Sequence, residues 1–387
     1  MTGTIYLDHA ATTPMRREVL EAMFPYFQRV YGNPSSVHSA GHEAADALRE
    51  ARERIAWVLE CAPEEIVFTS GGTESDNLAI IGGAEARRAY GDHVIVSTVE
   101  HEAVLQSVKE LRRRGFEVTL APVDDVGRID PEVLTDLVTE RTILVSCIYA
   151  NNEIGTIQPI AEIAAAVRRA NPKTLIHTDA VQAAGSLPLS VERLGIDMMS
   201  HSAHKIYGPR GVGVLYVRRG FELQPLLYGG GQERGVRSGT ENVAGAVGMA
   251  TALDLAESER AIECTRLIQL RDRLIAGMLD SCPSAHLTGD PLERLPGHAS
   301  FYFDDRSGES VLVDLDAHGI LCSSGSACHA GQTDPSHVLL ALGLAPSEAR
   351  NGLRMTLGRE NDDTHVKSVL KTVSELFGAV QVTPARV

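Results

Sequence analysis

The stretch "SHSAHKIYGPRGVGVLYV", residues 200–217, combines an apolar strand pattern with an unusual polar cluster. Ser202, His204 and Lys205 stand together and are followed by a turn rich in glycine and proline. A single lysine beside such a turn is ordinarily a solvated surface residue. The neighbouring segments therefore decide whether Lys205 belongs to a site.

Short β-branched runs alternate with helical patterns on both sides of this stretch. The expected strands share dense Val, Ile and Thr content and cover residues 65–70, 93–100, 142–150, 174–180 and 211–217. Amphipathic helical patterns cover residues 43–60 and 159–170. Alternation of this kind predicts an α/β fold with a mostly parallel sheet covered by helices on both faces. Such sheets bind ligands at the carboxyl ends of their strands.

The domain organisation is indicated by a long helical segment, residues 241–281, which we expect to break near Ser258. It would carry the chain from a large sheet domain into a smaller one. We expect residues 15–258 to form the large domain. Residues 1–14 and 259–387 would form the small domain, as an N-terminal arm plus the C-terminal part.

Composition excludes several classes of protein. The 387 residues carry 36 Lys and Arg against 51 Asp and Glu, a net charge of −15, which disfavours direct binding to nucleic acid. The sequence contains no run of about 18 apolar residues, so it predicts no membrane-spanning helix. The N-terminus "MTGTIYLDHAATTP" lacks the apolar core of a signal peptide, so we expect a cytoplasmic protein. The six cysteines form no C-x-x-C pair, and we predict reduced thiols and no metal site.

Two kinds of polar feature follow the expected strands. In "SGGTESDNLAI", residues 70–80, Gly71 and Gly72 permit a tight turn before a helix that begins near Thr73, and exposed amides there attract phosphate. A plain glycine turn explains the same letters equally well. Polar residues also follow four other strands, and they are His101, Asn152, Asp179 with Gln182, and His204 with Lys205. Together this set suits pyridoxal phosphate, whose aldehyde forms a Schiff base with lysine and whose pyridine nitrogen pairs with an aspartate.

Ordered motifs along nearly the whole chain make the resemblance specific. They are "YLDHAATTP" (6–14), "GNPSSVH" (32–38), "FTSGGTESDNLAI" (68–80), "NNEIGTIQPI" (151–160), "HTDAVQ" (177–182), "SAHKIYGPRGVG" (202–213), "GGGQERGVRSGTENV" (229–243) and "SSGSACHAG" (323–331). In these motifs the chain resembles the NifS/IscS-type cysteine desulfurases of the class V aminotransferase family. That resemblance implies the fold of the fold-type I pyridoxal phosphate enzymes. It comprises a large domain around a seven-stranded, mostly parallel sheet and a smaller α+β C-terminal domain.

The resemblance also implies a role for each matched residue. Contacts to the cofactor phosphate would come from Gly72, Thr73, Ser202 and His204, and, across a homodimer interface, from Thr240. Lys205 would carry the cofactor, while His101, Asp179, Gln182 and Asn152 would contact its ring. His101 would also act in catalysis by moving protons. Arg354 would bind the substrate carboxylate, with Asn152 near the substrate and Asn33 assisting. Cys328 would be the nucleophile.

The implied reaction converts L-cysteine into L-alanine and leaves the sulfur on Cys328 as a persulfide. The sulfur would pass to an acceptor protein that serves iron–sulfur cluster assembly, tRNA thiolation or DNA sulfur modification. The other cysteines lie in helix or strand patterns, and Cys322 is the strongest rival because it is six residues away. The small residues around Cys328 would admit a substrate and an acceptor.

Three departures from the family pattern keep alternatives open. Ala203 stands where glycine is usual, Gln232 where histidine is common, and His329 where threonine is typical. The segments "ACH", "GGGQER" and "ARNGLR" also resemble selenocysteine lyases, so that reaction remains an alternative. A catalytically silent docking platform and a transaminase on the same fold are further alternatives. A transaminase, however, would have no need of Cys328.

Overall fold

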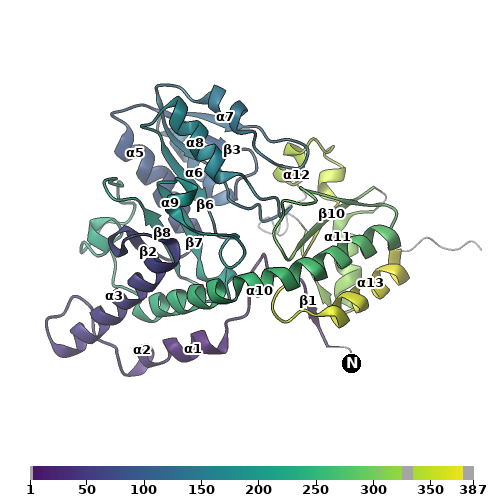
Figure 1. Ribbon diagram of the computed structural model, residues 1–387, viewed down its shortest axis with the longest axis horizontal. Helices are drawn as coiled ribbons and strands as arrows, with labels where there is room; N and C mark the ends of the chain where they lie inside the picture. Colours follow the sequence, from purple (N-terminus) through teal and green to yellow (C-terminus); the bar gives the residue numbers. More distant parts are fainter. Residues whose placement is uncertain (1–2, 305, 325–333, 378–387) are drawn as a thin grey trace, which may run out of the picture.

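The computed structural model of the chain describes residues 3–304, 306–324 and 334–377 (Figure 1). Its centre is a seven-stranded sheet whose spatial order is β2-β8-β7-β6-β5-β3-β4. In that order the strands are Ile66–Thr69, Gly213–Val217, Met198–Ser202, Leu175–Asp179, Thr142–Ser146, His93–Ser97 and Glu117–Ala121. Strands β7, β6, β5, β3 and β4 run parallel to one another, and β8 pairs antiparallel with both β7 and β2. The predicted mostly parallel sheet is therefore confirmed.

Burial explains why these runs form the centre. All residues of β3, β5, β6, β7 and β8 are buried, as expected for strands covered by helices on both faces. The covering helices and helical turns of this part of the chain are α3 (Ser39–Leu59), α4 (Gly72–Asn77), a π-helical turn (Leu78–Gly82), α5 (Gly83–Arg87), α6 (Glu102–Arg113), α7 (Pro131–Leu137), α8 (Ile160–Ala170) and α9 (Val191–Leu194). Two short helices, α1 (Arg17–Met23) and α2 (Pro25–Gln28), pack against α10 at the lower edge of Figure 1.

A second, smaller core is built from the N-terminal strand and the C-terminal third of the chain. Its three-stranded antiparallel sheet has the order β12 (Gly352–Thr356), β10 (His298–Phe303) and β9 (Ala285–Leu287). Strand β1 (Ile5–Tyr6) pairs in parallel with β11 (Ile320–Leu321). Helices α11 (Gly308–Ala317) and α13 (Asp363–Phe377) pack on this sheet, and α12 (His337–Ala341) lies against the large sheet domain.

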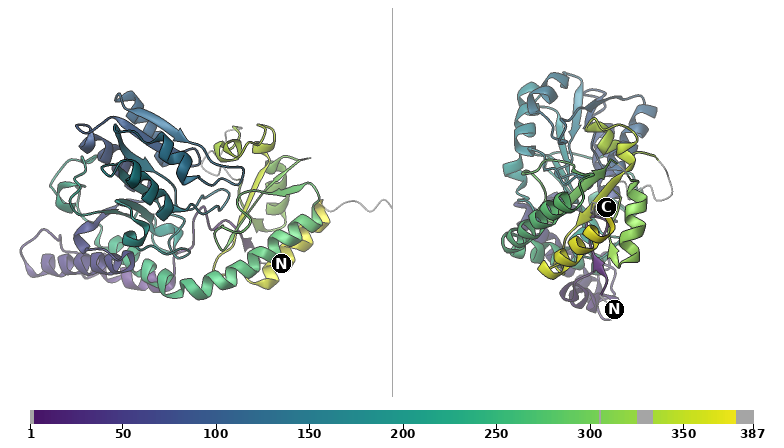
Figure 2. Two further views of the ribbon diagram at one scale, coloured as in Figure 1. Left: turned by 45° about the horizontal axis from the view of Figure 1, so that its top comes forward. Right: turned by 90° about the vertical axis from the view of Figure 1, so that its right-hand side faces the viewer.

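Helix α10 (Val243–Ser281) connects the two cores (Figure 2). Its first residues, Val243 to Leu253, pack in the large core, and its last turns, Leu270 to Met278, pack in the small one. At about 1.5 Å per residue the helix is roughly 58 Å long. The expected break near Ser258 is wrong. The Ser258 hydroxyl donates to Leu255 O at 3.0 Å within the helix, and residues 249–276 contain no glycine or proline. The domain boundary at residue 258 stays a prediction.

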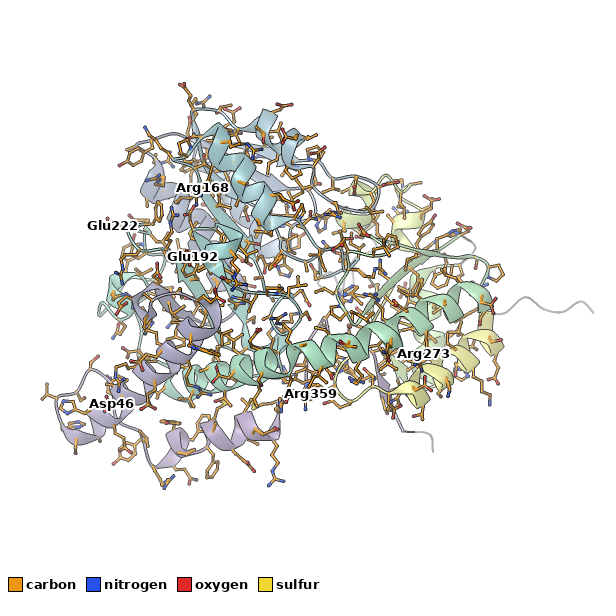
Figure 3. The ribbon with its side chains drawn as sticks, viewed as in Figure 1. Asp46, Arg168, Glu192, Glu222, Arg273 and Arg359 are labelled. Carbon is orange, nitrogen blue, oxygen red and sulfur yellow. The ribbon has the colours of Figure 1, made fainter. Side chains whose placement is uncertain are left out.

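Charged side chains such as Asp46, Glu192 and Arg273 lie on the outside of the molecule (Figure 3). Across the described residues, we find no helix with the length and apolar character needed to cross a membrane.

Candidate active site

A cavity of about 380 Å³ lies at the carboxyl ends of the sheet strands, between the two cores. Residues that the sequence pattern predicted for the site make up most of its wall, namely Gly72, Thr73, His101, Asn152, Asp179, Gln182, Ser202, His204, Lys205 and Arg354. They come from segments spread over more than two hundred residues of the chain. The parallel sheet brings them together because the carboxyl ends of its strands meet at one edge.

One end of the cavity is the turn between β2 and α4. Gly71 has φ of +153°, a conformation that favours glycine, and a Cβ on Gly72 would lie 2.8 Å from Val181 Cγ2. No side chain of the described residues caps the start of α4. The first amides of the helix therefore face the cavity end without a side-chain acceptor, which suits an oxyanion such as phosphate.

Lys205 follows β7 in a single 3-10 turn, Ala203–Lys205. Its Nζ donates to the carbonyl oxygens of Ala10 at 2.5 Å and Ala11 at 2.8 Å, so the N-terminal segment forms the opposite wall. Ala203, the departure from the glycine usual in this motif, is fully buried. Its methyl group is thus accommodated within the core.

Asp179 and His101 lie close together in the cavity wall, with an oxygen of Asp179 and a ring nitrogen of His101 within 4.8 Å of each other. Asp179, the last residue of β6, is 4% exposed, and its Oδ1 accepts a hydrogen bond from Val181 N at 2.9 Å. Burial raises the pKa of Asp179, while the neighbouring His101 and Lys205 lower it. His101 caps α6, and its Nδ1 accepts from Ala103 N at 3.1 Å. That bond leaves the proton of a neutral His101 on Nε2.

Arg354 reaches the cavity from β12 of the small sheet. Its side chain is 2% exposed, Nη1 donates to Asn152 O at 2.9 Å, and Nη2 donates to Asp8 Oδ1 at 2.8 Å. Its Nε is buried and has no hydrogen-bond partner among the described residues. A buried guanidinium with an unused donor at a cavity wall is suited to a carboxylate ligand.

Two predicted site residues of the described ranges, Thr240 and Asn33, do not line this cavity. Thr240 is exposed in the loop 229–240, where Gln232 Oε1 accepts from Gly239 N at 2.9 Å and Arg237 pairs with Glu74 at 2.8 Å. Asn33 is exposed, and its Oδ1 accepts from Ser35 N at 2.9 Å. The roles of both therefore stay predictions within a single chain. Cys328, like His329, lies outside the described residues.

The remaining cysteines are poor candidates for a thiolate. Burial raises the pKa of Cys61 and of Cys322 to about 12, and it also raises that of Cys147 and Cys264. Cys282 is fully buried at the end of α10. A thiol with a pKa near 12 keeps its proton at neutral pH, so Cys322 has little nucleophilic character.

Sequence reasoning missed five residues of the wall, which are Ala10, Ala11, Asp76, Ile148 and Val181. A signal existed for Asp76, because it lies three residues after Thr73 and so on the same face of a helix. Asp76 also forms a cluster with Asp179 and His101, in which carboxylate oxygens and a ring nitrogen lie within 4.8 Å of one another. Within the described ranges, this is the one group of such side chains close enough together to hold a metal ion. Ala10 and Ala11 contribute backbone carbonyls, for which side-chain chemistry gives no signal.

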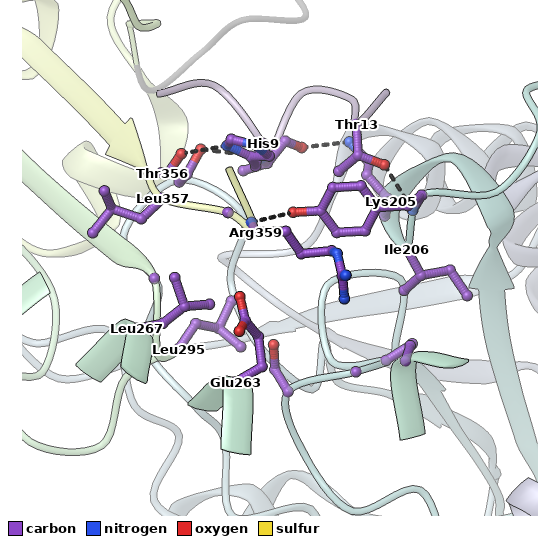
Figure 4. A pocket seen from close by; sticks show the side chains of 18 of the residues that line it. His9, Thr13, Lys205, Ile206, Glu263, Leu267, Leu295, Thr356, Leu357 and Arg359 are labelled. Carbon is purple, nitrogen blue, oxygen red and sulfur yellow. Dashed lines mark hydrogen bonds between the residues drawn. The ribbon is translucent and has the colours of Figure 1, made fainter. Parts of the chain in front are cut away.

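A smaller cavity, of about 120 Å³, shares Ala10, Gln182 and Lys205 with the first (Figure 4). His9 bonds through Nδ1 to Thr356 O at 2.9 Å, and Arg359 N donates to the Tyr207 hydroxyl at 2.9 Å. These contacts join the N-terminal segment, the Lys205 turn and the end of β12 around the second cavity. Lys205 is therefore accessible from two sides.

Comparisons with known proteins agree with this geometry. The Aminotransferase class-V family matches residues 5–369. The chain is 47% identical to a protein of Methanosarcina thermophila named cysteine desulfurase IscS, over 96% of this chain and 91% of that one. A solved NifS-like protein superposes with a TM-score of 0.91 at 40% identity, covering 96% of this chain and 98% of the other. A structure described as SspA in complex with cysteine gives a TM-score of 0.80 at 36% identity, covering 92% and 99%. The chain therefore belongs to the class-V aminotransferase family.

Proposed function

We propose that this protein is a pyridoxal phosphate-dependent cysteine desulfurase that converts L-cysteine into L-alanine and passes the sulfur to an acceptor. The observation that carries the proposal is the meeting of Lys205, Asp179 and Arg354 at one cavity. The amine of Lys205 would bind a carbonyl cofactor, and the carboxylate of Asp179 would pair with the ring nitrogen of that cofactor. The guanidinium of Arg354 would bind the carboxylate of an amino acid. Relatives named cysteine desulfurase support the choice of reaction.

The residues present fit the cofactor. The glycine turn at Gly71 and the uncapped start of α4 suit its phosphate, and Ser202 and His204 line the same cavity. The buried Asp179 suits the pyridine nitrogen, and Gln182 holds its amide beside Lys205 by donating to Ala10 O at 2.9 Å. When bound, pyridoxal phosphate supplies an electron sink for negative charge at the substrate Cα.

The protein's own groups bind the substrate and move its protons. Arg354 binds the carboxylate of cysteine with its fork of N–H donors. Lys205 Nζ, released from the carbonyls of Ala10 and Ala11, takes and returns the Cα proton. His101 would make a second proton transfer through Nε2, because its Nδ1 accepts a hydrogen bond from Ala103 N.

Cys328 receives the sulfur. Its thiolate forms a bond to the substrate sulfur while the C–S bond of cysteine breaks. The carbon keeps the electron pair of that bond and takes a proton, which gives alanine. The persulfide on Cys328 then transfers its outer sulfur to an acceptor protein.

The proposal also covers the sulfur acceptor and the cellular compartment. We propose a protein acceptor in the cytoplasm, since the net charge of −15 disfavours direct contact with nucleic acid. The free thiols of Cys61, Cys147, Cys264, Cys282 and Cys322 are in keeping with a reducing compartment.

We also propose a homodimer in which Thr240 completes the phosphate site of the neighbouring subunit. Exposed Thr240 lies apart from the cavity of its own chain, in a loop attached to α4 through the Arg237–Glu74 ion pair. Large apolar side chains are exposed near this end of the molecule, on α1, α2 and α3, and they include Phe24, Phe27 and Trp57. Exposed apolar area of this kind is typical of a surface covered in an oligomer.

The proposed function is tested by the products of the purified protein supplied with pyridoxal phosphate, L-cysteine and a thiol reductant. We expect alanine and sulfide in equal amounts. Consumption of selenocysteine with no reaction of cysteine would identify a selenocysteine lyase instead. Keto-acid formation would identify a transaminase, and a protein that stays colourless and inert would identify a docking platform.

Arg354→Gln should raise the KM for cysteine at least tenfold while the bound cofactor keeps its absorbance. A charge-assisted hydrogen bond is worth about 1.5–3 kcal/mol, and the substitution removes the charged fork that would hold the substrate carboxylate. Steady-state kinetics and a visible spectrum are the measurements. Arg273→Gln, at an exposed arginine far along α10, is the matched control. An unchanged KM for Arg354→Gln would contradict the assignment.

A further inference from the structure

Asp76 lines the proposed cofactor cavity but has no part in the chemistry proposed above. It lies on α4, is 1% exposed, and its Oδ1 has no hydrogen-bond partner among the described residues. A buried carboxylate oxygen without a partner is costly, because burial removes its water and no hydrogen-bond donor replaces it. The position therefore requires either a proton on the carboxyl group or a nearby cation.

The nearest charged neighbour is another carboxylate. Oxygen atoms of Asp76 and Asp179 and a ring nitrogen of His101 all lie within 4.8 Å of one another. Two buried negative charges at this separation repel each other, which favours a proton on one of the two carboxyl groups. The surroundings decide which one.

Asp76 has the Ser200 side chain as a hydrogen-bond partner, but more of the stabilising partners belong to Asp179. Asp179 accepts a hydrogen bond from Val181 N at 2.9 Å, and both His101 and Lys205 favour its charged form. Those influences oppose the effect of burial on Asp179. Its negative charge is thus compensated within the site.

Apart from the His101 ring, which lies within 4.8 Å of both aspartates, the ionisable groups near Asp76 are a neutral histidine and carboxylates, and the Ser200 side chain forms a hydrogen bond that lowers the pKa of Asp76. His177 Nε2 lies 3.7 Å from Asp76 Oδ1, but burial lowers the pKa of His177 to about 3, so this ring carries no charge. Its Nε2 is shared with the Ser200 hydroxyl at 2.9 Å. The nearby Glu100 adds negative charge, and burial raises the pKa of Glu100 to about 7. Burial and the charge of Asp179 accordingly raise the pKa of Asp76 well above its usual value.

We propose that Asp76 is a positioning residue that keeps its proton as a neutral carboxylic acid, so that the buried Asp76–Asp179 pair carries one negative charge, located on Asp179. An ionised Asp179 is the form that pairs with a protonated pyridine nitrogen. Asp76 acts through Asp179 and needs no contact with the substrate. The consequence for the cofactor rests on the proposed function, but the protonation state of Asp76 does not.

Infrared spectroscopy of the full chain with ¹³C-labelled aspartate tests the protonation state directly. We expect an isotope-shifted C=O band of a protonated carboxylic acid at pH 8, where Glu100 is mostly ionised and is in any case unlabelled. Asp76→Asn should remove that band, and Asp125→Asn, at an exposed surface carboxylate, should leave it. Absence of the band in the native chain, or its survival in Asp76→Asn, would overturn the proposal.

Unfolding equilibria give a second and independent readout. In the unfolded chain Asp76 ionises above about pH 4, whereas in the folded chain it keeps its proton. Unfolding therefore releases a proton from this residue, and the folding equilibrium constant falls about tenfold per pH unit until the pH passes the pKa of Asp76 in the folded chain. Asparagine is neutral in both states and lacks this dependence. Between pH 5 and pH 7, the unfolding constant of the native chain relative to Asp76→Asn should therefore rise about tenfold per unit. A ratio that is flat or falls with pH would show an ionised Asp76 and refute the proposal.

Both readouts work with or without pyridoxal phosphate, so failure of the cofactor proposal would leave them unchanged. With the cofactor bound, Asp76→Asn should retain the visible spectrum and its pH dependence, because asparagine imitates the neutral acid in shape and charge. A purely structural role would also tolerate asparagine, but it predicts neither the infrared band nor the unfolding slope.

Discussion

Lys205→Ala will give a chain that holds no covalently bound cofactor and whose desulfurase rate falls by about 10³-fold or more. Lys205 is the one lysine that lines the described cavity, and its Nζ donates to the carbonyls of Ala10 and Ala11. Removal of a positioned proton-transfer group alone costs about 10²–10⁴-fold. The anchoring bond to the cofactor is lost in addition.

The measurement is borohydride reduction of the wild-type protein followed by peptide mass spectrometry. We expect the reduced cofactor on the peptide that contains Lys205. Lys173→Ala, at an exposed lysine, is the matched control and should retain both colour and rate. Cofactor trapped on any other lysine would disprove the assignment.

Subunit mixing with the same variant tests the shared site. A Lys205→Ala subunit paired with a Thr240→Val subunit would form one site with both defects and one with neither. Activity should then rise above that of either variant alone, toward half of the wild-type rate per mixed dimer. A mixture that only averages the two separate activities would contradict a site completed by Thr240 of the neighbouring subunit.

Cys328→Ala will keep the bound cofactor and bind cysteine, yet release sulfide and alanine at least about a hundredfold more slowly, because the nucleophile is gone. The expectation rests on elimination as well as on the sequence motif. Cys147 and Cys282 are buried, and burial raises the pKa of Cys61 and Cys322 to about 12.

Mass spectrometry after one turnover without reductant locates the sulfur. We expect one added sulfur on Cys328 and none on Cys322, and Cys322→Ala should retain most of the activity. The comparison is sharp because the two residues are six positions apart. An added sulfur on Cys322 would reverse the assignment.

The sequence by itself determined the sheet and most of the residues at its edge. Strong β-branched runs such as residues 142–146 and 213–217 are fully buried strands, and the alternation with helices predicted a mostly parallel sheet, in which residues 213–217 form an antiparallel strand. Side chains that follow those strands, including His101, Asp179 and Lys205, line one cavity. The reason is geometric: parallel strands place their carboxyl ends together, so position along the chain predicts position in space.

The tertiary structure alone decided the features that depend on distant partners. Helix α10 is unbroken through Ser258 because its two ends are held in two different cores, which local sequence does not report. Arg354 is held by Asn152 O and Asp8, residues remote in sequence, and Lys205 is held by the backbone carbonyls of Ala10 and Ala11. The pKa of Asp76 depends on the charge of Asp179, which is more than a hundred residues away in the sequence. Electrostatic coupling and backbone hydrogen bonding depend on distances in space, and a sequence pattern does not give those distances.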